Sequence, residues 1–161
     1  MLTDLNLLLQ QVLEDQEILI KEKHARFELE KLPSIAVNPG QIRQVFQNII
    51  SNALKFIKKG TPPVVRIHAK IGPGPTGQQD NSRFCHISIK DNGIGFDEKF
   101  ADNIFTLFRR LHTKDRFEGT GIGLAISKKI VEKHGGNIIA KGEEGEGAEF
   151  IIILPVSNET L

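Results

Sequence analysis

One stretch of helical periodicity, residues 40–57, constrains the fold of this 161-residue chain more than any other feature. Its apolar side chains recur at the spacing that only a helix brings onto one face: Ile42, Val45, Phe46, Ile49, Ile50, Ala53 and Leu54. Gly60 and the pair Pro62-Pro63 then stop the helix. The stripe predicts a helix with one buried face, so the rest of the chain must supply a surface that covers it.

Alternating apolar and polar residues predict short strands over 27–29, 34–37, 65–71, 85–89 and 138–141, and 72–82 is expected to be a hairpin-type loop. The two neighbouring strands 65–71 and 85–89 suggest an antiparallel pair. A last strand over 148–154 is continuously apolar, so we expect it in the interior of the sheet. Further helices are predicted over 4–22, with Thr3 as the cap, and over 122–130, closed by Gly135-Gly136.

Strands and helices do not alternate strictly in this pattern. The predicted fold class is therefore α+β, a two-layer α/β sandwich, with a mixed, mostly antiparallel sheet of about five strands packed on one face by about three helices.

Composition excludes several classes of protein. Lys and Arg number 21 against 20 Asp and Glu, a net charge of +1, so nucleic acid is not an expected partner. The apolar runs are too short to span a bilayer, and no basic and apolar leader follows Met1. The one cysteine, Cys85, cannot form an internal disulfide, and no zinc-ligand spacing is present. We expect a cytoplasmic domain with no direct membrane contact.

The polar stripe of the helix over 40–57 carries Asn48, Asn52 and Lys55, each about one turn from the next. A solvated face is one interpretation. Asn costs about 0.5 kcal/mol relative to Ala inside a helix, so two stacked Asn residues hint at a use beyond solubility. An amide oxygen is a hard ligand that suits Mg²⁺, and the Lys55 ammonium could meet phosphate.

Two glycine-rich segments add to this stripe. The segment DNGIGF, residues 91–96, leaves a strand through a turn, where the Asp91 carboxylate could accept a hydrogen bond from the amino group of adenine. The segment GTGIGL, residues 119–124, opens a helix and points backbone N–H groups at an anion. It is not a Walker loop, because no Gly-Lys-Ser/Thr follows, and it is not a dinucleotide fingerprint, because Leu124 stands where the last glycine of the fingerprint would be. The protein-kinase catalytic-loop signature is also absent.

A cationic stretch lies between the two glycine segments: Arg109, Arg110, His112, Lys114 and Arg116. It could fold over a triphosphate and neutralise it. An exposed basic loop is the other interpretation.

Four segments, taken in their order along the chain, closely resemble the catalytic and ATP-binding domain of sensor histidine kinases. They are the Asn48/Asn52/Lys55 stripe, DNGIGF, IFTLFRRLH and GTGIGLAISKKIVEKHGG. The resemblance spans about residues 30–155 and includes the closing GEGAEFIIILP. The stretch FRRLHTKDRFEGTGIGLA is most similar to kinases attached to phytochrome-like or PAS-like sensors. The wider superfamily, which includes gyrase and mismatch-repair ATPases, shares the Bergerat α/β sandwich. The resemblance implies ATP and Mg²⁺ as cofactors.

The resemblance also implies roles for single residues. Asn52 is the expected magnesium ligand, Lys55 is expected to touch phosphate, and Asp91 is expected to bind adenine. The other implied positions are Phe56 beside the base, Gly93 and Gly95 in the pocket, Phe105 and Phe108 before the lid arginine Arg110, and Gly119, Thr120, Gly121, Gly123 and Leu124 at the phosphates.

Asn48 separates two kinds of relative, because hydrolytic members such as gyrase place a glutamate there to activate water, whereas histidine kinases commonly have asparagine. An amide cannot act as a general base. The resemblance thus implies transfer of the γ-phosphoryl group to a histidine, with Asn48, Lys55 and Arg110 as the catalytic set.

The chain departs from the family's pattern in one large respect. The phosphoacceptor pattern, His followed by Glu or Asp, is absent at all five histidines: His24, His68, His86, His112 and His134. We therefore expect a catalytic half that does not autophosphorylate alone. Its expected partners are the dimerisation and phosphoacceptor domain of a parent kinase and, downstream, a response-regulator receiver domain.

The expected organisation is an N-terminal helix at the junction with the missing domain (1–25), the ATP-binding domain (26–156) and a C-terminal tail (157–161). Ala148, where many relatives have Ser or Thr, is a smaller departure. Two alternative functions stay open from the sequence: a degenerate nucleotide-binding switch without kinase activity, and a stand-alone Bergerat-fold ATPase, which Asn48 argues against.

Overall fold

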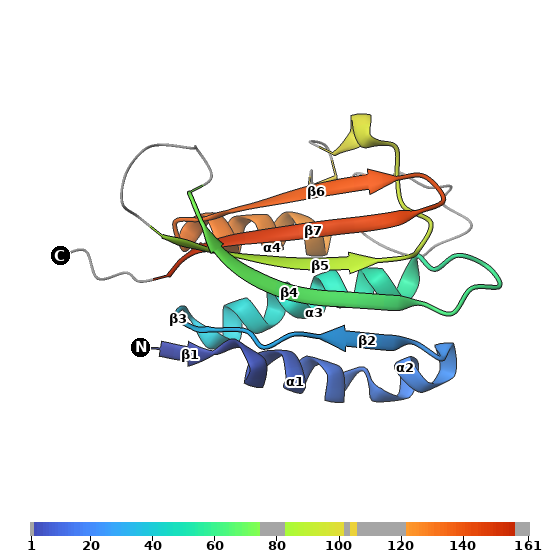
Figure 1. Cartoon of the computed structure of the whole chain (residues 1–161), viewed down its shortest axis with the longest axis horizontal. Helices are drawn as coiled ribbons and strands as arrows, with labels where there is room; N and C mark the ends of the chain where they lie inside the picture. Colours follow the sequence, from blue (N-terminus) through green and yellow to red (C-terminus); the bar gives the residue numbers. More distant parts are fainter. Residues whose placement is uncertain (1, 75–82, 102–103, 106–121, 157–161) are drawn as a thin grey trace.

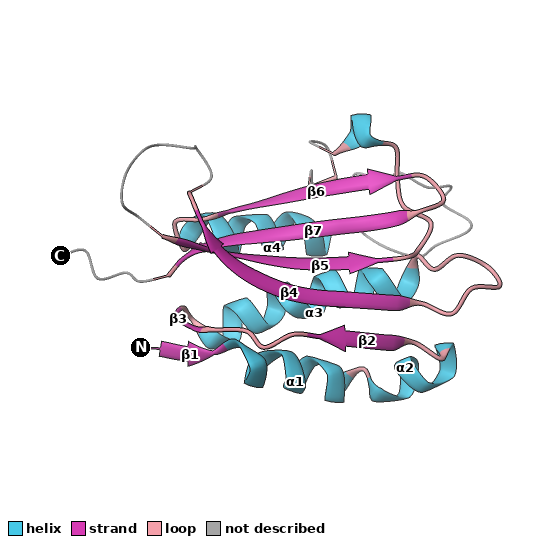
Figure 2. Cartoon of the chain, viewed as in Figure 1, coloured by secondary structure: helices cyan, strands magenta, loops and turns pink. Residues whose placement is uncertain are grey.

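The computed structural model describes residues 2–74, 83–101, 104–105 and 122–156. Its main layer is a five-stranded sheet, with helices lying behind it in the view of Figures 1 and 2. The strand order is β2 (Arg26–Leu29), β4 (Val64–Gly72), β5 (Phe84–Asp91), β7 (Gly147–Pro155) and β6 (Asn137–Glu143). Only β2 and β4 pair in parallel; the other pairs are antiparallel. The predicted two-layer sandwich and its mixed, mostly antiparallel sheet are confirmed.

The helices are α1 (Leu5–Asp15), α2 (Glu17–Lys23), α3 (Pro39–Lys55) and α4 (Ile122–Lys133), with a short 3₁₀ helix at Glu98–Phe100. Helices α3 and α4 lie behind the sheet, and α1 and α2 run beside its β2 edge (Figure 1). In the described part of the chain, no helix is both long and apolar enough to cross a bilayer.

Helix α3 is the centre of the core and confirms the strongest sequence prediction. Its N-cap is Asn38, whose Oδ1 accepts from the backbone N–H of Gln41 over 3.0 Å, and Pro39 is its first residue, where the missing N–H costs nothing. All seven apolar residues of the predicted stripe are buried. Each of the six side chains larger than Ala53 contributes about 1.5–3 kcal/mol when removed from water, so the stripe fixes which face of α3 meets the sheet.

The N-terminal segment differs from its prediction. The single helix expected over 4–22 is two helices, because the chain leaves helical geometry at Gln16, whose Nε2 donates to Ser51 Oγ on α3 over 3.0 Å. The cap is Asp4 rather than Thr3: Asp4 Oδ1 accepts from the N–H of Asn6 over 2.9 Å. Thr3 belongs to a small strand and donates its hydroxyl to Val37 O, so it is not available to cap.

That small strand, β1 (Leu2–Asp4), pairs antiparallel with β3 (Ser34–Ala36) in a separate two-stranded sheet. The strand predicted over 34–37 therefore forms, but outside the main sheet. Strand β7 lies between β5 and β6, which confirms the interior position expected from its apolar run. Its side chains Phe150, Ile152 and Leu154 are all buried in the core.

Helices α3 and α4 pack antiparallel and are joined near the end of α4 by His134. The ring Nε2 of His134 accepts from the backbone N–H of Asn38 over 3.1 Å, while its Nδ1 donates to Ile130 O over 2.8 Å. Gly135 follows in the left-handed conformation, at φ 83°, and Gly136 N–H closes the helix on Val131 O, as the sequence predicted for this pair of glycines.

Candidate functional site

The candidate site begins at Asp91, where β5 ends. One oxygen of its carboxylate, Oδ1, accepts from the backbone N–H groups of Gly93, over 2.8 Å, and Ala148, over 3.2 Å. No hydrogen bond within the described residues involves the other oxygen. Burial raises the pKa of Asp91 to about 6, although the two backbone hydrogen bonds act in the opposite direction. Among the described residues, the carboxylate is thus held by one oxygen only, and its other oxygen can accept from a ligand.

The turn after Asp91 is locked to the end of α3. The N–H of Ile94 donates to Phe56 O over 3.0 Å, and a Cβ on Gly93 would lie only 2.2 Å from that same oxygen. Gly95 adopts a φ of 67°, where a side chain is strained. The structure therefore brings together Phe56, Asp91, Gly93 and Gly95, which the resemblance assigns to one nucleotide pocket.

The turn between β6 and β7 completes this arrangement, and sequence reasoning missed it. Gly147 adopts a φ of 124°, and a Cβ there would lie 2.1 Å from Asp91 O. Gly145 donates its N–H to Ile94 O over 2.8 Å. The segment GEGAEF is part of the resemblance, but Gly145 and Gly147 were not among the predicted site residues, although their spacing was the available signal. Ala148 contacts Asp91 through its backbone, so this contact does not depend on the missing Ser or Thr side chain.

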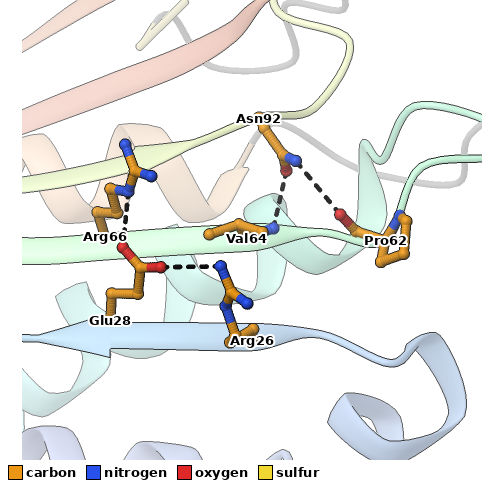
Figure 3. Close-up of polar contacts among 6 residues, drawn as sticks. All are labelled: Arg26, Glu28, Pro62, Val64, Arg66 and Asn92. Atoms are coloured by element: carbon orange, nitrogen blue, oxygen red, sulfur yellow. Dashed lines mark hydrogen bonds and ion pairs between the residues drawn. The ribbon is translucent and has the colours of Figure 1, made fainter.

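Asn92 fixes the same turn from its other side. Its Oδ1 accepts from the N–H of Val64 over 2.8 Å, and its Nδ2 donates to Pro62 O over 3.2 Å, as Figure 3 shows. These bonds tie the end of β5 to the start of β4. Asn92 was not among the predicted site residues, and its position beside Asp91 is the signal that could have found it.

The polar face of α3 carries the remaining described candidates. Asn48 donates through Nδ2 to Gly123 O and to Ser127 Oγ, both over 3.0 Å, which brings Asn48 and Gly123 together. In the described residues Asn52 makes no side-chain hydrogen bond, and Lys55 is exposed. From Asn48 to Phe56 the helix rises about 12 Å. The face thus spans from the start of α4 to the turn that holds Asp91.

Two of the predicted site residues, Phe105 and Leu124, lie in the hydrophobic core. Phe105 is buried against Phe150, edge to face with ring centroids 6.0 Å apart, and Lys128 Nζ lies 5.3 Å from the centre of its ring. Leu124 is also buried, at 6% exposure, in the first turn of α4. The other predicted positions, Phe108, Arg110, Gly119, Thr120 and Gly121, lie outside the described residues, as does the rest of the cationic stretch 109–116.

A magnesium ion at this site would depend on amide and phosphate oxygens. Nowhere in the described ranges do three His, Cys, Asp or Glu residues gather into a metal-binding cluster. The Asn52 amide suits the role, because it is partly exposed and its oxygen is not engaged by the described residues. The donor set fits Mg²⁺ that arrives with a polyphosphate.

A groove of about 500 Å³ lies elsewhere, between α1, the start of α2 and the end of β2. It is lined by apolar, acidic and amide side chains, and none of the predicted site residues borders it.

Comparison with known protein families gives a match over most of the chain. The model of a family described as "Histidine kinase-, DNA gyrase B-, and HSP90-like ATPase" matches residues 37–158.

Named relatives include cyanobacterial phytochrome A of Nostoc, 43% identical over 137 residues, which cover 85% of this chain and 17% of the relative. The sensor histidine kinase WalK of Bacillus subtilis is 34% identical over 151 residues, or 90% of this chain and 23% of the relative. The chain thus spans about a fifth of the length of these proteins.

Solved structures share the fold over nearly the whole chain. A catalytic domain of the histidine kinase ThkA, nucleotide-free, aligns with a TM-score of 0.73 and 25% identity, covering 98% of this chain and 97% of that one. Full-length ShkA in complex with AMPPNP aligns with a TM-score of 0.74 and 30% identity, covering 96% of this chain and 30% of that one.

Proposed function

Because this chain belongs to the family of histidine kinase-, DNA gyrase B- and HSP90-like ATPases, we propose that it is the ATP-binding catalytic domain of a two-component sensor histidine kinase. In this proposal it transfers the γ-phosphoryl group of ATP to a histidine on a dimerisation domain outside this sequence. Its fold is the Bergerat sandwich of that family.

One observation carries the proposal: the Asp91 carboxylate is anchored through Oδ1 by Gly93 and Ala148, and no described residue donates to its second oxygen, which can accept a hydrogen bond. An exocyclic amino group, such as that of adenine, is a matching donor. Phe56 and the glycines at 93 and 95 would shape the pocket around the base. The fixed turn means that little reorganisation accompanies binding.

The polar face of α3 would then meet the phosphates. Lys55 would contribute positive charge, and the amide oxygen of Asn52 would hold Mg²⁺. Bound Mg²⁺ would stabilise the charge that develops on the transferred phosphoryl group. Arg110 and the glycine loop at 119–123, with Thr120, are proposed to contact the same phosphates; Phe105 and Leu124 would support this side from the core.

Asn48 supports transfer to a histidine over hydrolysis. Its NH₂ group already donates to Gly123 O and Ser127 Oγ, and an amide has no basic group that could take a proton from water. The γ-phosphoryl group would therefore be kept for a nucleophile delivered by another domain.

We propose that this nucleophile comes from the dimerisation and phosphoacceptor domain of the parent kinase, and that a response-regulator receiver domain accepts the phosphoryl group afterwards. Histidine kinases act with such partners in general. A cytoplasmic location fits this use of ATP. The segment 1–25 is proposed as the junction with the parent, although the apolar face of α1 also packs into the domain core.

The first test is calorimetric titration of ATP with and without Mg²⁺, because the chain has no Trp or Tyr for an intrinsic fluorescence signal. We expect Mg²⁺-dependent binding with a Kd at or below about 1 mM, about 4 kcal/mol, and its loss in Asp91→Ala. Phosphotransfer should follow when the phosphoacceptor domain is added. Absence of any ATP binding by the native chain would overturn the proposal.

A further inference from the structure

Ser127 is fully buried on α4 and makes a compact set of hydrogen bonds with α3. Its hydroxyl donates to Gly123 O, one turn earlier, over 2.9 Å, and accepts from Asn48 Nδ2 over 3.0 Å. Asn48 Nδ2 also lies 3.0 Å from Gly123 O. We call these three groups, the Asn48 amide, the Ser127 hydroxyl and the Gly123 carbonyl, the polar triangle.

The polar triangle permits only one orientation of the Asn48 amide. If the amide were turned over, its oxygen would face the Gly123 carbonyl oxygen at about the same distance, and two acceptors would repel each other. With the NH₂ end fixed on α4, the amide oxygen is the group left for a partner. No described residue donates to it.

The close approach that makes this possible depends on Gly123. A Cβ at this position would lie 3.3 Å from Asn48 Cγ, tighter than ordinary packing, so the glycine admits the amide against the first turn of α4. Ser127 is one of two buried polar side chains in the described residues, the other being Ser88. A buried hydroxyl is costly unless it is hydrogen-bonded. Here its hydrogen bond from Asn48 joins α4 to α3, and both helices are candidates for contact with the nucleotide.

We propose that Ser127 is a positioning residue that acts through Asn48: it fixes the amide so that its oxygen faces the Mg²⁺-ATP site. The inference rests on the proposed function, since it assigns the oxygen to the Mg²⁺ ion or to a water molecule bound to that ion, both of which an amide oxygen can meet. It adds a residue that contacts neither base nor phosphate.

The experiment is a double-mutant cycle on Ser127→Ala and Asn48→Ala, with ATP affinity measured calorimetrically with and without Mg²⁺. We expect Ser127→Ala to reduce the Mg²⁺-dependent gain in affinity about three- to tenfold, the range of one net hydrogen bond, and to leave Mg²⁺-free binding unchanged. In the Asn48→Ala background the same substitution should have no further effect on the gain.

Ser88→Ala is the matched control, because Ser88 is also buried, at 4% exposure, but donates to Glu149 instead. It should leave the Mg²⁺-dependent gain unchanged. A second readout needs no nucleotide: in ¹⁵N-resolved NMR spectra, the Asn48 side-chain NH₂ signals should move in Ser127→Ala and stay in Ser88→Ala.

The outcomes separate the two levels of inference. Mg²⁺-dependent binding that is equal in the native chain and Ser127→Ala overturns the role of Ser127 and leaves the proposed function standing. If Ser127→Ala reduces the Mg²⁺-dependent gain as much in the Asn48→Ala background as in the native chain, Ser127 does not act through Asn48, and its positioning role is also overturned. Failure of the native chain to bind ATP overturns the proposed function and this inference together, and unmoved NMR signals reject the positioning by themselves.

Discussion

Ala148, on β7, donates its backbone N–H to the same oxygen of Asp91 that accepts from Gly93, although 57 positions of the sequence separate the two residues. The fold therefore fixes the orientation of a carboxylate that burial makes costly to ionise. The charge that suits this carboxylate to accept from adenine thus lowers the stability of the domain.

Asp91→Asn should stabilise the domain and abolish ATP binding. The folded pKa of about 6 lies above the ordinary 3.8, so the ionised form is disfavoured by the fold, and this cost is complete once the pH has risen well past 6. The amide keeps an acceptor for the two N–H groups but turns a donor toward adenine. We expect a gain of about 1–3 kcal/mol in the free energy of unfolding at pH 8, and almost none at about pH 3, where the carboxyl is protonated in both the folded and the unfolded state.

Thermal unfolding at both pH values, with ATP calorimetry at pH 8, measures these effects. An equal gain at both pH values would show that ionisation of Asp91 is not the cause.

Gly93→Ala should destabilise the domain and weaken ATP binding, because the new Cβ would lie 2.2 Å from the Phe56 carbonyl oxygen. Backbone must move to relieve that clash, at a cost of about 2 kcal/mol or more. Gly40→Ala is the control: a Cβ there would meet only Asn38 Oδ1, at 3.6 Å, in the first turn of α3. Denaturant titration should find Gly40→Ala neutral or slightly stabilising, and similar losses in both variants would contradict the steric argument.

Asn52→Ala should reduce the Mg²⁺-dependent gain in ATP affinity about tenfold, or about 1.4 kcal/mol, while leaving Tm nearly unchanged. The side chain makes no hydrogen bond in the described structure, so its removal costs the fold little. Gln44→Ala, an exposed polar residue on the same helix, should change neither quantity. Calorimetry and thermal unfolding test both variants, and full retention of Mg²⁺ dependence would exclude Asn52 as a ligand.

Asn92→Ala should lower the free energy of unfolding by about 1–3 kcal/mol, because the Val64 N–H would lose its partner at the start of β4 (Figure 3). Asn92→Asp keeps an acceptor for Val64 and loses only the donor to Pro62 O, so it should cost less. Denaturant titration ranks the two, and an Asp variant as unstable as the Ala variant would contradict this assignment.

Glu28→Gln should change Tm little at pH 7. Glu28 pairs with Arg66 Nε over 2.8 Å and Arg26 over 3.0 Å, and its hydrogen bond from Arg66 is the main cause of its lowered pKa (Figure 3). The cluster is exposed, and water and salt screen it. Any stabilisation by this cluster is present above the ordinary pKa of 4.5 and is lost as the pH falls through the lowered pKa of Glu28. Thermal unfolding of both proteins at low and high salt measures the effect. A large salt-dependent difference in Tm between them would contradict this prediction.

The periodicity of residues 40–57 predicted α3 and its buried face because helix spacing and burial are both local properties of the sequence. The interior place of β7 followed from its apolar run for the same reason. The helix break at Gln16 could not be predicted, since it accompanies a contact with Ser51, 35 positions away.

The site shows the same division. Asp91, Gly93 and the α3 asparagines are recognisable by their motifs, whereas the roles of Ala148 and Gly147 depend on a backbone N–H and a close approach that no side chain reveals. Ser127 looked like an ordinary helix residue because its partner Asn48 lies 79 positions earlier in the chain.

Helix α4 is attached to α3 at two places, by Asn48 near its first turn and by the ring of His134 just beyond its last. Its two ends cannot fray separately without breaking a hydrogen bond to the same neighbour. Amide hydrogen exchange along α4 should therefore report one shared opening energy for the whole helix rather than separate, lower values at its two ends.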